Sequence, residues 1–457
     1  MLLNYTLKTI SNWKTWRLAV FFVPFIVVLF WLDIFTWQIP LALLLSFLAY
    51  TFFYNKLWQL LVLAPPLIIF GTIISLQIRP GWAYEMTITE AIILMVFVVY
   101  FFERFFSLQM QKIRLDGLVF IMFFYFVWAL FSYSEFGHLH NFIGQAKVLL
   151  YGLMAYFLAI NLFDELYKIK AFFSSLGVLV ILLSLQLFWK FYDMGFSSKF
   201  FFERSSILLP SGALALVASI LAMILPLMLT MSFAEKNNYK RYFYLLATIL
   251  GLMAVFMTLG KAAIGSLALG IMVIFLKFRS KRLGIALSLL SMTTLVFIFM
   301  TPYLEGFVTR LGNVTTDSNI SFRIEEYVIA TKILRENWLW GVGLGQEPVW
   351  YAKYYAFKYN ELVNNYWLQI ILDLGVIGLG LALSAFVYIM VQIKKLISIS
   401  QNVKVADSWY AYGLIGCGVV VFFNGLAEVT IFALNYGILL WLLVGISKAF
   451  LNLKEQI

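Results

Sequence analysis

Three basic residues stand where apolar stretches of the chain begin or end. Arg204 lies in FFERSSILLPSG, Lys261 in TLGKAAIG between two apolar runs, and Arg323 in the polar stretch SNISFRIEEY. A charge at the edge of a bilayer is expensive and is usually retained for a partner. If the three side chains meet, they form a positive pocket for a phosphate or pyrophosphate, because Arg gives bidentate contacts and Lys a point charge. Each of them alone is explained equally well by snorkelling to the membrane surface.

Aromatic side chains accompany these cations in the polar stretch. Tyr327 shares a predicted helix face with Arg323, one turn further on. Trp350 and Tyr354 lie in a second segment, Val349–Tyr359, whose pattern suits a helix lying flat on a membrane surface. Their rings offer stacking faces for a glycan.

The histidines and the glycines of the chain have structural as well as chemical interpretations. The two histidines of the chain, His138 and His140, fall in a loop between apolar runs, where either can accept a proton or be incidental. The glycine cluster GVGLG at 341–345 invites a phosphate-loop interpretation, yet no strand precedes it and no GK[ST] follows. A tight turn after the Arg323 helix is the better interpretation. The later glycines Gly375 and Gly378 favour close contact between helices.

Composition decides what kind of protein must position these residues. The 457 residues are 63% hydrophobic and only 12% charged, with a mean hydropathy of +0.92. Such a chain is a polytopic membrane protein rather than a soluble domain. The net charge is +11, but the basic residues do not form a soluble basic domain, which argues against nucleic acid as a partner. With Cys417 as the one cysteine, no internal disulfide and no thiolate metal cluster can form, and we expect no metal and no cofactor.

Apolar runs of roughly 20 residues predict the membrane-spanning helices. We expect an all-α polytopic membrane protein with about 12–14 transmembrane helices and one large extracytoplasmic helical loop. The predicted runs are Leu18–Ile34, Ile39–Tyr54, Leu57–Leu76, Thr87–Phe102, Leu115–Tyr133, Val148–Leu162, Ala171–Phe188, Ser211–Met231, Tyr242–Leu259, Ala262–Phe275, Leu283–Thr301, Tyr366–Val391, Ala411–Asn424 and Thr430–Phe450.

The distribution of Lys and Arg predicts the orientation. When the N-terminus is placed in the cytoplasm, the short cytoplasmic segments hold most of the 33 basic residues, as the positive-inside rule requires. Both termini are then cytoplasmic, and the long loop lies on the outer side. We therefore predict a single membrane domain over residues 1–457 with an inserted extracytoplasmic subdomain at 302–365.

The polar stretch and its flanks resemble a known family. The resemblance rests on RIEEY, then WLWGVGLG, then NNYWLQIILDLGVIG re-entering the membrane, with Arg204 before SILLPSGALALV and TLGKAAIG upstream. This pattern is similar to the bacterial O-antigen ligase and polymerase superfamily, which includes Wzy-type polymerases, O-antigen ligases and O-oligosaccharyltransferases. The specific agreement covers Glu203–Leu381; the first 190 residues or so match only in being helical spans.

The resemblance implies a function and a set of roles. Members are GT-C-like membrane glycosyltransferases that move a glycan from undecaprenyl pyrophosphate to an acceptor, with neither a nucleotide sugar nor a required metal. By position, Arg204, Lys261 and Arg323 would hold the pyrophosphate. Membrane lipid and an undecaprenyl-pyrophosphate-linked glycan are the implied partners, and whether a chain-length regulator also binds is left open. The implied location is the bacterial inner membrane.

One position departs from the family pattern. Ligases of this family have a histidine just before the N-x-[YF]-L motif, where this chain has Asn364, followed by Asn365. Asparagine cannot act as a general base, so Glu361, His138 or His140 would take the proton, or transfer would rely on stabilising the leaving group. Asn364 and Asn365 would then orient sugar hydroxyls. The departure argues against a standard ligase more than against a polymerase.

Our hypothesis from the sequence is an inverting, metal-independent polymerase that joins lipid-linked oligosaccharide repeat units at the outer face of the membrane. Transfer to lipid A core or to another acceptor, as by an O-antigen ligase, is the near alternative. A transporter or flippase for polysaccharide precursors would instead predict internal repeats and charges near the bilayer middle. A purely structural role in a polysaccharide assembly complex is a third alternative.

Overall fold

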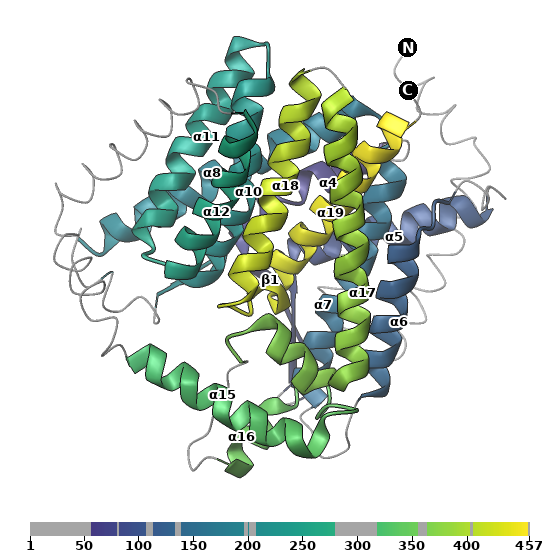
Figure 1. The fold of residues 1–457 in the computed structure, drawn as a ribbon, viewed down its shortest axis with the longest axis vertical. Coiled ribbons are helices and arrows are strands. Elements are labelled where there is room, and N and C mark those ends of the chain that lie inside the picture. Colours follow the sequence, from purple (N-terminus) through teal and green to yellow (C-terminus); the bar gives the residue numbers. More distant parts are fainter. Residues whose placement is uncertain are drawn as a thin grey trace.

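The computed structural model describes residues 56–79, 82–106, 113–132, 139–195, 200, 207–278, 318–354, 363–402 and 405–455. Within these residues the chain is an all-α polytopic membrane protein with two short β-hairpins (Figure 1). The elements are α4 Leu57–Leu63, η1 Pro66–Phe70, β1 Thr72–Arg79, β2 Trp82–Thr87, α5 Ile88–Phe106, α6 Gly117–Phe131, α7 Leu139–Leu162, α8 Leu166–Asp193, β3 Leu208–Leu209, β4 Gly212–Ala213, α10 Leu214–Ala234, α11 Asn238–Met257, α12 Lys261–Phe278, α15 Ser318–Asn337, α16 Glu347–Tyr354, α17 Tyr366–Asn402, α18 Val405–Gly425, η4 Thr430–Phe432 and α19 Leu434–Glu455.

Seven of the described helices are long and apolar enough to cross a membrane: α7, α8, α10, α11, α12, α17 and α19. Their positions agree with the predicted runs to within several residues, with two exceptions: α7 begins nine residues before Val148, and α17 continues eleven residues beyond Val391. The first two predicted runs and the run Leu283–Thr301 lie outside the described residues, as does part of the predicted insertion 302–365.

The predicted span Leu57–Leu76 is wrong. Helix α4 ends at Leu63, a 3-10 turn follows, and β1 begins at Thr72. The reason is the pair Pro65 and Pro66, because proline lacks the N–H that continues a helix and also disfavours a helical residue before it. β1 then pairs antiparallel with β2. This apolar stretch therefore forms a short helix, a 3-10 turn and a strand instead of one spanning helix.

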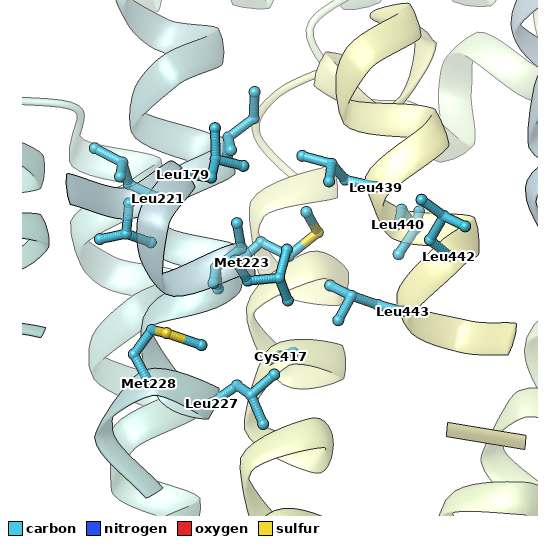
Figure 2. Packing of buried hydrophobic residues seen from close by; sticks show 14 of the residues in the cluster. Leu179, Leu221, Met223, Leu227, Met228, Cys417, Leu439, Leu440, Leu442 and Leu443 are labelled. Atoms are coloured by element: carbon cyan, nitrogen blue, oxygen red, sulfur yellow. The ribbon is translucent and has the colours of Figure 1, made fainter. Parts of the chain in front are cut away.

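Helix α10 is the centre of the bundle. It packs against α18, α11 and α12, and all but a few of its residues are buried. Met223 and Leu227 of α10 lie beside Cys417 of α18 in an apolar interior, and Leu440 and Leu443 of α19 lie on the far side of Met223 (Figure 2). Such packing is the physical basis of association in lipid, where helices gain little from the hydrophobic effect alone.

Helices α12 and α18 pack closely at glycines and run in opposite directions. A Cβ at Gly270 of α12 would meet Val420 and the Gly416 carbonyl of α18, while Lys277 of α12 lies over the Tyr412 ring of α18. As residue numbers rise along α12 they fall along α18, so the two helices are antiparallel. The start of α12 and the end of α18 therefore lie at the same end of the bundle.

Helices α15 and α16 lie across one end of the bundle, away from the main helix stack (Figure 1). Their buried face includes Ile329, Ile333 and Tyr351, which pack with Val363 and Leu372 at the start of α17. The polar stretch is thus anchored to the bundle where α17 begins.

Helix α17 is broken at Gly375, which has φ 64° and ψ −167°. The break frees three carbonyls, and other parts of the chain bond to them: Val342 N–H donates to Leu372 O at 2.8 Å, Gly343 N–H to Asp373 O at 2.9 Å, and Trp128 Nε1–H to Leu374 O at 3.0 Å. Since lipid offers no hydrogen bonds, freed backbone groups need such partners. The GVGLG cluster is the turn predicted from the sequence, and it also completes the broken helix.

Candidate functional site

Arg323 reaches from α15 to the loop that follows α18. Its Nη1 donates a hydrogen bond to Ala427 O at 2.8 Å, and its Nη2 lies 3.2 Å from Glu428 Oε1. The Arg323 side chain is 33% exposed and that of Glu428 19% exposed. A half-buried guanidinium with one carboxylate partner keeps donors for an anion that arrives from solution.

Lys261 begins α12 at the same end of the bundle. The preceding residue, Gly260, lies beside Ala218 of α10, and Asn424 of α18 donates to the hydroxyl of Ser219, the next residue of α10, at 3.0 Å. Lys261 is exposed. The structure therefore brings Lys261 to the end of α18 from which the Arg323-binding loop emerges, and its role in holding pyrophosphate stays a prediction.

Asn364 and Asn365 connect the polar stretch to α17. The Asn365 Oδ1 accepts from the N–H groups of Trp367 and Leu368 at 3.0 and 3.1 Å, which is an N-cap, and its Nδ2 donates to Leu426 O at 3.3 Å. Asn364 donates through its backbone N and its Nδ2 to the Glu326 carboxylate at 3.3–3.4 Å. Both asparagines thus hold the entry to α17 in place.

Helix α15 fixes this entry from its buried side. The Tyr327 hydroxyl donates to Asn364 O at 3.1 Å, and the Tyr351 hydroxyl of α16 donates to Glu326 O at 2.9 Å. Glu326 is only 2% exposed. Because Arg323 lies one turn before these contacts, they also fix the position of its guanidinium.

The other predicted site residues are placed as follows. Trp350 of α16 is half-buried, and the Lys353 ammonium lies 4.9 Å from its ring centre. His140 is exposed at the start of α7, beside Asn141, whose carbonyl borders Gly345. Tyr354 ends α16, and its side chain is not described. Arg204, Glu361 and His138 lie outside the described residues.

Glu428 was not selected from the sequence. It lies in NGLAEVT, between two apolar runs. The sequence does contain a signal for Glu428: a carboxylate between two closely spaced membrane helices is rare unless it has a partner.

An apolar cavity of about 600 Å³ begins beside this site. Its walls come from α6, α7, α17, α18 and α19, and they extend along α17 from Tyr366 to Ile397. Gly425, Thr430 and Phe432 also line it, and these residues flank the Ala427 and Glu428 contacts of Arg323. The loop that Arg323 contacts therefore adjoins a long apolar space between helices.

The comparison with known families gives a direct result. Residues 246–383 match the O-antigen ligase family. The matched segment includes Lys261, Arg323 and Asn364, so the resemblance seen in the sequence is confirmed there. It supports a membrane enzyme of the O-antigen ligase and polymerase type, a family whose substrates are lipid-linked glycans. No curated protein matches the chain.

Proposed function

We propose that the chain is a membrane glycosyltransferase that polymerises undecaprenyl-pyrophosphate-linked repeat units at the outer face of the cytoplasmic membrane. The observation that carries the proposal is Arg323, held at the end of the bundle where Lys261 also lies, against a loop whose flanking residues line an apolar cavity. The donor has the matching shape: a diphosphate head next to a long hydrocarbon chain. With the polar insertion on the outer side of the membrane, both termini of the chain are cytoplasmic.

The mechanism follows from the charges. Arg323, with Lys261 and Arg204 as further cations, holds the pyrophosphate while a hydroxyl of a second glycan attacks the anomeric carbon from the opposite side, which inverts that carbon. The bond from the anomeric carbon to the pyrophosphate oxygen breaks, and its electron pair leaves with the phosphate. Electrostatic stabilisation of that developing charge is often the largest single contribution to catalysis. No metal or nucleotide enters this scheme.

The break in α17 bears on the transporter alternative. Transporters use broken helices whose freed backbone groups bind a substrate or an ion near the middle of the membrane. Here the freed carbonyls of Leu372, Asp373 and Leu374 accept hydrogen bonds from Val342, Gly343 and Trp128. The break is thus occupied by the protein itself, which favours the enzyme.

Deleting the gene for this chain in the producing cell tests the proposal and distinguishes a polymerase from a ligase. A polymerase deletion leaves acceptors that carry single repeat units, because a separate ligase still transfers them. A ligase deletion leaves long polymer on the lipid carrier and none on the acceptor. We expect the first pattern in a gel of the polysaccharide. Polymer of normal length on the normal acceptor would contradict both forms.

The cavity gives a prediction of its own. Gly418 of α18 lines it, and a Cβ there would meet only the end of Ile393 at 3.6 Å. Gly418→Leu should fill part of the space and raise KM for the lipid-linked donor by about 10-fold or more, because each buried methylene of the chain is worth about 0.8 kcal/mol. Gly265→Leu, on an open face of α12 outside the cavity, is the matched control. Equal KM values for the two variants would show that the donor chain does not use this space.

A further inference from the structure

We propose that Glu428 is the general base that takes the proton from the attacking sugar hydroxyl. This inference rests on the proposed function. The carboxylate lies 3.2 Å from the Arg323 guanidinium, at the group assigned to the leaving pyrophosphate. A carboxylate in contact with that group lies close to the proposed reaction centre, and it can accept a proton, which Asn364 cannot.

The loop that carries Glu428 is well fixed. The backbone N–H groups of Ala427 and Glu428 donate to Asn424 O at 3.1 and 2.9 Å. Asn365 holds Leu426 O from the α17 side, and Arg323 holds Ala427 O from the α15 side. Three segments of the chain thus fix the backbone that aims this carboxylate. At 19% exposure, it is shielded but within reach of a substrate.

The nearby carboxylates on α15 are less suitable. Glu326 is buried and accepts hydrogen bonds from both the backbone and the side chain of Asn364. Glu325 is exposed on α15. Among the described carboxylates of this region, Glu428 combines partial burial with a direct contact to Arg323.

Binding of the donor would exchange the partners of Arg323. Before it binds, the guanidinium is paired with Glu428. The pyrophosphate brings more negative charge and competes for the same donors, which releases the carboxylate beside a new anion. A neighbouring negative charge favours proton uptake by a carboxylate. Once released from Arg323, the Glu428 carboxylate turns toward the acceptor hydroxyl, on the side of the anomeric carbon opposite the pyrophosphate. The hydroxyl oxygen then bonds to the anomeric carbon, the pyrophosphate leaves with the electron pair of the broken bond, and the proton passes to Glu428 and later to water.

Three described elements adjoin the loop that carries Glu428, and each has titratable or charged groups at this end. Arg323, Glu325, Glu326 and Tyr327 lie on α15. Tyr366 begins α17 and Tyr436 lies in the first turn of α19. Of these, Arg323 is the group in contact with the carboxylate.

The test uses membrane vesicles that contain the full chain and, as probe, the lipid-linked glycan that accumulates in the deletion strain. Glu428→Gln keeps a hydrogen-bond acceptor for Arg323 but cannot take a proton. We expect kcat to fall by about 10²–10⁴-fold with little change in KM. Glu428→Asp should recover part of the rate. Glu336→Gln, an exposed acid at the far end of α15, is the matched control and should keep the wild-type rate.

The pH profile separates a base from a residue that only positions Arg323. A base works deprotonated, so the wild-type kcat should fall as the pH is lowered, and Glu428→Gln should lose this acid limb. A raised KM with the acid limb intact would overturn the inference and leave Glu428 as a partner of Arg323. A wild-type rate in Glu428→Gln would also overturn it. If wild-type vesicles do not consume the probe, the proposed function itself is rejected, and this inference with it.

Discussion

Replacing Arg323 with alanine should lower the rate of glycan transfer by about 10²–10³-fold, the cost of removing one preorganised donor to a developing negative charge. The guanidinium joins the polar insertion to the Ala427–Glu428 loop through a charged contact. The measurement is the release of lipid carrier in vesicles, together with polymer length in the producing cell. Arg323→Lys keeps the charge but loses the bidentate guanidinium, so its rate should lie between those of the wild type and Arg323→Ala.

The control for this experiment is Arg335→Ala, on the same helix but exposed in its last turn. It should leave both the rate and the polymer length unchanged. Because Arg323→Ala also leaves Glu428 without its cation, the amount of protein in the membrane must be compared with wild type. Normal polymer from a normal amount of Arg323→Ala would remove the pyrophosphate role.

Gly375→Ala should have the largest effect on folding. A Cβ at this position would lie 2.1 Å from Leu339 O and 2.7 Å from Gly341 N. The backbone angles, φ 64° and ψ −167°, belong to a region that glycine alone occupies readily. Strain and clash together should cost more than about 3 kcal/mol. We expect a strong loss of folded protein from the membrane and a lower melting temperature.

Gly380→Ala is the matched control, since it lies on the same helix with nothing within 4 Å of an added Cβ. It should be neutral or slightly stabilising, because alanine restricts the unfolded chain. If both variants accumulate and melt alike, the break in α17 is not required, and the GVGLG cluster needs another explanation.

Much of the candidate site could be predicted from residue type and hydropathy. Arg323 and Lys261 were found because charges next to apolar runs are costly and therefore informative. The helices of the bundle were found because a spanning segment must be long and apolar. The span Leu57–Leu76 failed for a local reason, since hydropathy takes no account of Pro65 and Pro66.

The rest depends on contacts between segments far apart in the sequence. Glu428 lies 105 residues from Arg323, and no local pattern pairs them; the antiparallel packing of α12 and α18 brings Lys261 to the same end. Asn365 was predicted to bind sugar, yet only the fold shows that it caps α17. The sequence by itself determined a membrane bundle with cations at its surface, because solvation energy acts on each residue separately. Only the tertiary structure decided which carboxylate and loop contact Arg323 and which helices line the nearby cavity, because both depend on how helices pack.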